Sequence, residues 1–175
     1  DARLALALAR TAATRGALLV NYCAATGLLH DAGKVVGLTC EDRETGQTYR
    51  VQARCVVNAA GVWVDEFRQK DGEALGRPAK PMVAPSQGVH LVVDREFLPG
   101  DHALMVPKTA DGRVLFGVPW LGKVILGTTD TPRGDLAREP DAFAEEVQFI
   151  LGESARYLKR APTSADVKSI WVGLR

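Results

Sequence analysis

His90, which enters an expected strand, is the side chain in this sequence best suited to proton transfer. It follows the short run Pro85-Ser86-Gln87-Gly88-Val89. At the edge of a cavity it could act as a general base, because an ordinary histidine pKa of about 6.5 leaves most of the imidazole neutral. The residues alone equally allow a half-buried strand histidine that is hydrogen-bonded to a carbonyl. His30 and His102 stand in turn-like stretches beside aspartates, and we expect both to be solvated.

Two further segments place polar groups at the ends of strands. In Leu126–Thr131 two adjacent threonines precede an aspartate, and Thr128 and Asp130 could bind a polyol or orient a catalytic group. Such residues also cap turns, and the spacing alone favours that alternative. The final Gly173-Leu174-Arg175 offers a guanidinium, an always-charged fork that suits phosphate or carboxylate. An arginine in this place can also simply be solvated.

Small residues follow the expected strand Cys55–Asn58, namely Ala59, Ala60 and Gly61. They would let a bulky ligand approach the backbone, and the N–H groups of a following helix, expected over Val62–Gln69, can bind a phosphate. A tight strand-to-helix turn that needs Gly61 only for its backbone angles is the alternative, and the spacing alone favours it.

Other familiar site patterns are missing from the 175 residues. The sequence contains no His/Cys/Asp cluster with the spacing of metal ligands, no G-x-S-x-G, no Walker loop and no G-x-G-x-x-G. Its three cysteines, Cys23, Cys40 and Cys55, are an odd number without C-x-x-C spacing. We expect buried thiols in a reducing compartment and no metal site.

The composition excludes several classes of protein. Lysine and arginine number 22 and aspartate and glutamate 21, so the net charge is +1. A nucleic-acid-binding module would need a basic excess, and a disordered acidic tail would need an acidic one. No apolar run approaches the roughly 20 residues that span a bilayer, and we expect no signal peptide. Because the chain opens on Asp1 and closes within an apolar strand, we expect a piece of a longer protein.

Hydrophobic periodicity predicts the elements that must position these side chains. The order of helices and strands predicts a mixed α/β or α+β fold in two lobes, residues 1–75 and 76–175. The polar stretch 70–80 is the expected crossing between them. The expected helices are 1–15, 62–69 and 141–159, and the expected strands are 17–24, 35–40, 48–53, 55–58, 89–93, 103–107, 114–120, 124–128 and 166–175.

Taken in order, these segments resemble FAD-dependent glycerol-3-phosphate dehydrogenases of the D-amino-acid-oxidase-like flavoprotein superfamily. The resemblance covers essentially the whole chain, and its most specific part is Gly127–Asp130 preceded by the Pro119-Trp120 strand. Asn-Ala-Ala-Gly alone is shared by many flavoproteins. The matching segments are Asp1–Leu4, Val57–Trp63, Gln87–Val93, Leu115–Trp120, Ile125–Thr131 and Val172–Arg175.

The resemblance implies FAD as the cofactor and assigns residues to it. The segment that passes the diphosphate falls on Asn58–Trp63, so Ala60, Gly61 and Trp63 would contact FAD, and the strand that touches the adenine end falls on Tyr22–Ala24. The family often has Ala-Thr-Gly where this chain has Ala59-Ala60-Gly61. Its Gly-x-Gly-x-x-Gly fingerprint would precede Asp1, so we expect the isolated piece to be inactive.

For the substrate site, the resemblance implies His90 as the proton-handling group and Arg175 as the arginine that binds substrate. Thr128 and Asp130 would support these two residues without binding the substrate themselves. The family often has Lys-Gly-Ser-His where this chain has Gln87–His90. The implied reaction is oxidation of sn-glycerol 3-phosphate to dihydroxyacetone phosphate, with FAD passing electrons to a quinone. The implied location of the full-length protein is the cytoplasmic side of a membrane surface, to which segments outside this chain would attach it. The alternatives are an oxidase of the same superfamily acting on an amino or 2-hydroxy acid, and a non-catalytic folding unit.

Overall fold

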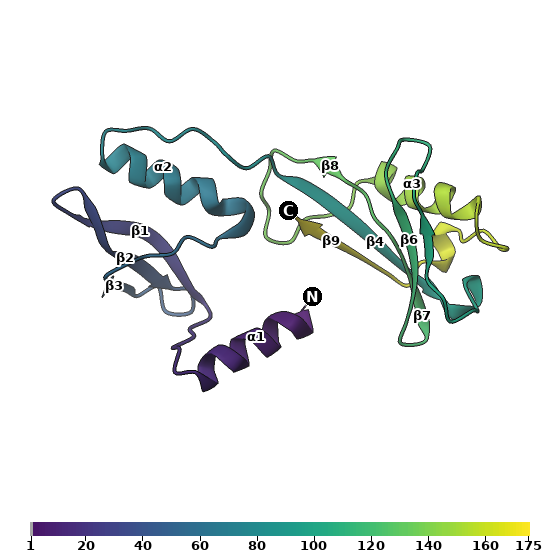
Figure 1. Ribbon diagram of the computed structural model, residues 1–175, viewed down its shortest axis with the longest axis horizontal. Helices are drawn as coiled ribbons and strands as arrows, with labels where there is room; N and C mark the ends of the chain where they lie inside the picture. The colour runs from purple at the N-terminus through teal and green to yellow at the C-terminus, as the bar shows by residue number, and fades with distance from the viewer. Residues whose placement is uncertain (1) are drawn as a thin grey trace. The chain divides into compact units, whose positions relative to one another are not determined.

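Antiparallel sheets and helices make up the chain, of which a computed structural model describes residues 2–175 (Figure 1). The expected mixed α+β fold is confirmed. The chain divides into two compact units. The first comprises the residues up to 59 together with 64–80, and the second comprises residues 60–63 and 81–175.

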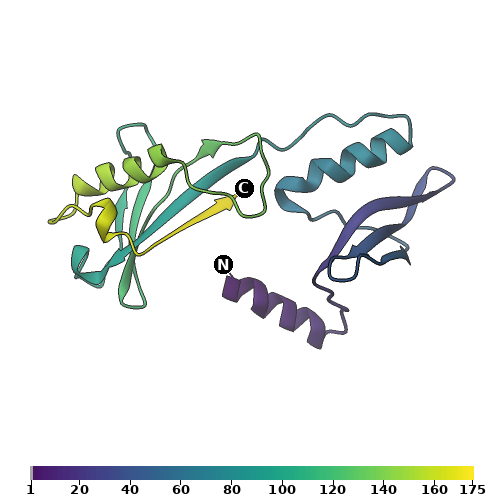
Figure 2. The same ribbon diagram turned by 180° about the vertical axis from the view of Figure 1, so that it is seen from behind.

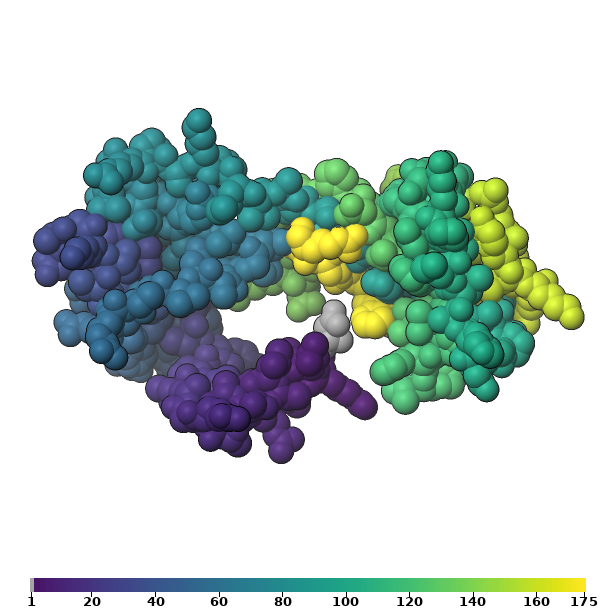
Figure 3. All heavy atoms as spheres, in the orientation of Figure 1, coloured from purple at the N-terminus to yellow at the C-terminus, as the bar shows by residue number. Residues whose placement is uncertain are grey.

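The first unit is a three-stranded antiparallel meander with two helices. Strands β1 (Cys23–Asp31), β2 (Lys34–Asp42) and β3 (Thr48–Gln52) lie in that order, and the strands expected over residues 35–40 and 48–53 are present and pair with each other. Helix α1 (Ala2–Thr14) has no buried residue, and Figure 3 shows its purple side chains open to solvent on the face in view. Helix α2 (Val64–Ala74) follows the sheet in sequence.

Three expectations for this unit are wrong. Residues 17–22 form no strand and are exposed, and β1 begins only at Cys23. Residues 55–58 join no β-ladder within the described chain, since an apolar run becomes a strand only where a neighbour accepts its hydrogen bonds. His30 lies in β1, not in a turn, and its Nε2 is 2.8 Å from Oδ1 of Asp71 on α2.

The second unit is a six-stranded antiparallel sheet with one helix against it (Figures 1 and 2). The strand order is β5-β6-β7-β4-β8, and β9 pairs with the other edge of β4. The strands expected beyond residue 85 are all present, with slightly different ends. The bounds are β4 Ser86–Asp94, β5 Leu104–Val106, β6 Leu115–Trp120, β7 Lys123–Gly127, β8 Thr131–Pro132, α3 Ala144–Ala155 and β9 Ser169–Leu174.

Alternation along β4 separates the core of this unit from its open face. Val89, Leu91 and Val93 are fully buried and belong to the same cluster as Ile150 of α3, whereas His90 points to the opposite face. Phe143 lies within the helix expected over residues 141–159, but it precedes α3 and is 39% exposed. The core cluster consists of Val89, Leu91, Val93, Phe97, Val106, Leu115, Val124, Leu126, Ile150, Leu151 and Leu158.

Truncating a core side chain of β4 should destabilise this unit. We expect Leu91→Ala to lower the free energy of unfolding by about 2–5 kcal/mol, because it leaves a cavity between the sheet and α3. Urea denaturation followed by tryptophan fluorescence measures it. Leu121→Ala is the control, since Leu121 is 76% exposed and its loss should change stability by less than about 0.5 kcal/mol. Equal losses in both variants would contradict the assignment of the core.

Candidate active site

His90 lies on the open face of the second unit, between two neighbouring strands. Its register partners are Gly127 on β7 and Trp171 on β9. The imidazole and the Trp171 indole have ring centroids 5.4 Å apart at a tilt of 53°. A Cβ on Gly127 would stand 2.5 Å from Cδ2 of His90, so the absence of a side chain there makes room for the imidazole. The half-buried ring is thus held from both sides.

Arg175 is fixed to the same face through its backbone and one nitrogen of its side chain. Its N–H donates to the Ser86 carbonyl at 2.9 Å, and its own carbonyl accepts from the Ser86 N–H at 2.8 Å. Its Nη2 donates to the Thr129 carbonyl at 2.6 Å and lies 3.2 Å from Oδ1 of Asp130. Within the described residues, Nη1 and Nε donate to no protein group, so they can meet a ligand oxygen.

Gly88 is the point at which the candidate substrate residues converge. A Cβ at this position would overlap the Arg175 guanidinium and would lie 2.8 Å from Oγ1 of Thr128. His90 is two residues further along β4 and therefore on the same face. The structure thus brings together the four predicted residues His90, Arg175, Thr128 and Asp130 in one place.

The charges of the site favour a neutral imidazole beside an ionised carboxylate. Burial, and then the nearby Arg175 charge, lower the pKa of His90 below its ordinary value. The Ser86 hydroxyl and the Arg175 guanidinium lower the pKa of Asp130, so this exposed side chain is charged at neutral pH. The site therefore combines a proton acceptor with a cation that is held by an anion.

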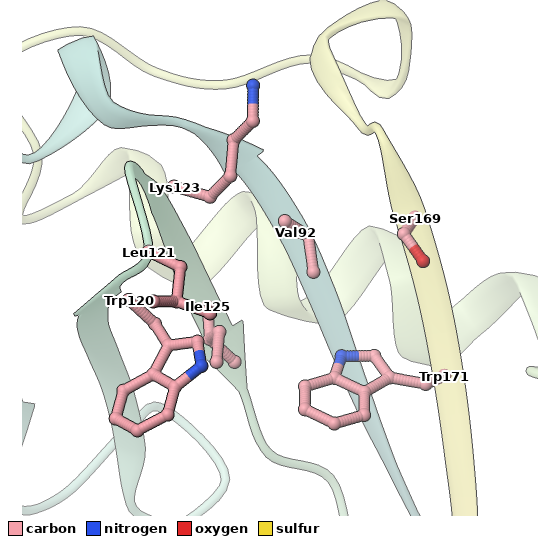
Figure 4. Close-up of a pocket in the computed structure, with 7 residues that line it drawn as sticks. All are labelled: Val92, Trp120, Leu121, Lys123, Ile125, Ser169 and Trp171. Carbon is pink, nitrogen blue, oxygen red and sulfur yellow. The ribbon is translucent and has the colours of Figure 1, made fainter.

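A shallow hollow of 360 Å³ lies further along the same sheet face. Figure 4 shows the indoles of Trp120 and Trp171 beside it, with Val92 and Ile125 between them. Lys123 at its rim pairs with Asp94 at 2.6 Å. The hollow is therefore mainly apolar and aromatic, and Trp171, which lines it, also contacts His90.

The small-residue segment folds differently from the expected strand, turn and helix. Gly61–Trp63 form a 3₁₀ turn, and α2 begins at Val64. Gly61 has φ +58°, and nothing lies within 4 Å of where its Cβ would be, so the backbone is open to a bulky group. Asp65 and Glu66 in the first turn of α2 already complement the helix dipole. The start of α2 thus already carries negative charge, and the open stretch of backbone lies at Gly61.

Trp63 has a clear structural role in the second unit. Its Nε1 donates to the Leu136 carbonyl at 3.0 Å, while the neighbouring Val62 is buried. Ala24, the candidate contact for adenine, lies in the first unit on β1, half-buried and opposite Glu41. These contacts neither require nor prevent a cofactor.

Metal chemistry has no support in residues 2–175, where no group of three His, Cys, Asp or Glu side chains could hold an ion. The cysteines are free thiols, of which Cys40 is buried and Cys23 half-buried. The expectation of three buried thiols is wrong for Cys55, which is exposed because its segment joins no sheet. None of the described helices combines the length and apolar character needed to cross a bilayer.

Comparison with known proteins places this arrangement in a family. A family model described as FAD dependent oxidoreductase matches residues 1–175, the whole chain. The chain belongs to this family. Mitochondrial glycerol-3-phosphate dehydrogenase of Schizosaccharomyces pombe is 39% identical over 181 residues, covering 100% of this chain and 28% of that protein. The mitochondrial enzyme SDP6 of Arabidopsis thaliana, also a glycerol-3-phosphate dehydrogenase, is 39% identical over 177 residues, covering 100% of this chain and 27% of its own.

A solved structure shows the same fold. The X-ray structure of the glycerol-3-phosphate dehydrogenase from Bacillus halodurans, complexed with FAD, matches this oxidoreductase chain with a TM-score of 0.88 and 39% identity. The match covers 100% of this chain and 35% of that one. The chain therefore spans about a quarter to a third of the length of these relatives.

Removing the charge of Arg175 should raise the pKa of His90. We expect the His90 pKa to rise in Arg175→Met but to stay below the ordinary value, because burial of the ring remains. A histidine NMR titration of the chain measures the change. Arg156→Met, which removes a cation paired with Glu153, should leave it unchanged. An unaltered His90 titration in Arg175→Met would show that the two side chains are not neighbours.

Proposed function

We propose that the full-length protein containing this chain oxidises sn-glycerol 3-phosphate to dihydroxyacetone phosphate. The observation that carries the proposal is that His90 lies on the same sheet face as Arg175, whose guanidinium covers Gly88 and whose charge acts on the imidazole. A neutral base and a cation with two unused donors suit a substrate that has a hydroxyl to deprotonate and a phosphate to bind. The identity of about 39% to glycerol-3-phosphate dehydrogenases supports this substrate.

FAD is the cofactor that we propose, and the residues present fit part of its site. The open backbone at Gly61 can approach the diphosphate, with Ala60 directly before it in the chain. Nothing lies within 4 Å of where a Cβ on Gly173 would be, so the strand surface near Trp171 is flat there. Trp63 would border the same segment, and the backbone of Ala24 would contact the adenine end. FAD, when bound, supplies the acceptor for the hydride that leaves C2.

The residues of the chain would carry the proton and the charge. Nε2 or Nδ1 of His90 takes the proton of the C2 hydroxyl, which the lowered pKa of the ring permits because the imidazole is neutral beforehand. Arg175 binds an anionic oxygen of the substrate and so orients C2. Asp130 and the Thr129 carbonyl hold Nη2 of the guanidinium in place, and the Thr128 hydroxyl lies beside it over Gly88.

The remaining parts of the proposal concern the full-length protein. Residues up to 75 would form part of an FAD-binding lobe and residues 76–175 the substrate-side sheet. We propose a quinone as the electron acceptor, reached at the cytoplasmic side of a membrane surface through segments outside this chain. The proposals of a quinone and of a membrane location follow from the resemblance to the dehydrogenases. Reduction of a soluble dye in place of the quinone provides the activity assay for the two variants that follow.

His90→Gln in the full-length protein should lower kcat for glycerol 3-phosphate by about 10²-fold or more, the usual contribution of a positioned acid–base group. Content of FAD and thermal stability should stay near those of the unaltered protein, because the ring lies at the edge of the open face. His102→Gln, at an exposed bend, is the matched control. An unchanged kcat in His90→Gln would leave His90 with a purely structural role.

Arg175→Lys should lower kcat/KM for glycerol 3-phosphate by about tenfold or more, since lysine replaces a planar fork by a point contact. The value of kcat/KM for glycerol, which lacks the phosphate, should fall much less if Arg175 binds that group. Dye-linked rates with both substrates measure the difference. Equal losses would place Arg175 at the C2 oxygen, and no loss with either substrate would remove Arg175 from the site.

A further inference from the structure

A carboxylate is buried behind the sheet, on the side opposite His90. Glu146, in the first turn of α3, is 4% exposed, and its two oxygens accept four hydrogen bonds. Oε1 accepts from the hydroxyls of Thr129 at 2.9 Å and Thr131 at 2.6 Å. Oε2 accepts from Nε2 of Gln87 at 2.5 Å and from the Phe143 N–H at 3.0 Å. One side chain therefore ties α3 to β4, to β8 and to the loop before β8.

Glu146 is ionised although no cation pairs with it directly within residues 2–175. Burial raises its pKa, but the hydrogen bonds from Thr131, the Phe143 amide, Thr129 and Gln87 outweigh this effect and lower it. The cation Arg133 is linked to it through Gln87. Arg133 donates to the amide oxygen of Gln87, and the amide nitrogen of Gln87 donates to Glu146. A buried charge of this kind is weak evidence for stability, because apolar residues of similar volume stabilise a core as well or better. A role in positioning neighbouring residues explains the buried carboxylate of Glu146 better than a role in stability does.

Thr129 links this carboxylate to the candidate active site. It is fully buried, and its hydroxyl donates to Glu146 while accepting the Val89 N–H at 3.0 Å. Its carbonyl, on the same residue, accepts the 2.6 Å hydrogen bond from Nη2 of Arg175. Val89 directly precedes His90 in β4. Both hydrogen bonds of the hydroxyl therefore decide where the carbonyl points and where the guanidinium can rest.

We propose that Glu146 is a positioning residue that acts through Thr129 to hold the Arg175 guanidinium on the substrate side of the sheet. The proposal rests on the proposed function, in which Arg175 binds an anionic oxygen of the substrate. Arg175 is half exposed, so a long side chain with several rotamers would otherwise be free to leave the site. Holding it in one place beforehand removes that ordering from the cost of binding.

The test is the substitution Glu146→Gln in the full-length protein. The new amide can accept on one side only. Its NH₂ group faces either the donors of Gln87 and Phe143 or the hydroxyls that donate to Oε1, so the network must rearrange in both orientations. We expect KM for glycerol 3-phosphate to rise about tenfold, within the range for residues coupled by one hydrogen-bond network, with a much smaller change in kcat. Glu153→Gln removes another buried carboxylate from the same helix, one whose side chain pairs within residues 2–175 with Arg156 alone, and should leave KM unchanged.

A double-mutant cycle shows whether the effect passes through Arg175. In an Arg175→Lys background, Glu146→Gln should raise KM much less than in the unaltered protein, because the group that it positions has been replaced. Full additivity of the two changes, or an equal rise in Glu153→Gln, would overturn the proposal and leave Glu146 with a general structural role.

A second measurement does not depend on the substrate. In the chain itself, Glu146→Gln should shift the His90 NMR titration in the same direction as loss of the Arg175 charge. Thr129→Val, which removes only the linking hydroxyl, should do the same if Glu146→Gln fails to fold. Thr131→Val, which removes the other hydroxyl on Oε1, is the control. If glycerol 3-phosphate proves not to be a substrate, the proposed function fails but this titration still decides the positioning role, and an unmoved titration in Thr129→Val overturns it.

Discussion

Strand β4 is the constraint on which the second unit depends. It lies between β7 and β8 on one edge and β9 on the other, so its backbone hydrogen bonds are used on both sides. Its side chains can therefore point only to the helix or to the open face. Val89, Leu91 and Val93 fill the core, and the residues between them face outward. A shift of one residue in register would bury His90 and expose the core.

Most of the second unit could be predicted from the sequence, because its strands are apolar runs bounded by turn residues and its helix has an apolar stripe. The first unit could not be predicted as well. The run of residues 17–22 has the same apolar character as a strand, but no neighbour pairs with it in the described chain. Composition gives the tendency to pair, and only the tertiary structure provides the partner.

The candidate site divides in the same way. His90, Thr128, Asp130 and Arg175 could be singled out from residue type and their positions at strand ends. Trp171 could be recognised only from the β4–β9 register, which places it beside His90. Glu146 resembled an ordinary acidic residue that complements a helix dipole, and the sequence held no sign that two threonines and a glutamine from other elements would converge on it.

The pairing of β4 with β9 has a consequence for how the chain folds. These strands are hydrogen-bonded along their length from Gln87–Leu174 to Val92–Ser169, although they stand at opposite ends of the second unit in sequence. Non-local pairing of this kind slows folding, because the intervening loop must be closed before the contact forms. During synthesis, β4 leaves the ribosome well before β9 and waits with one edge unpaired. The guanidinium of Arg175 can therefore reach Gly88 only once β9 has paired with β4.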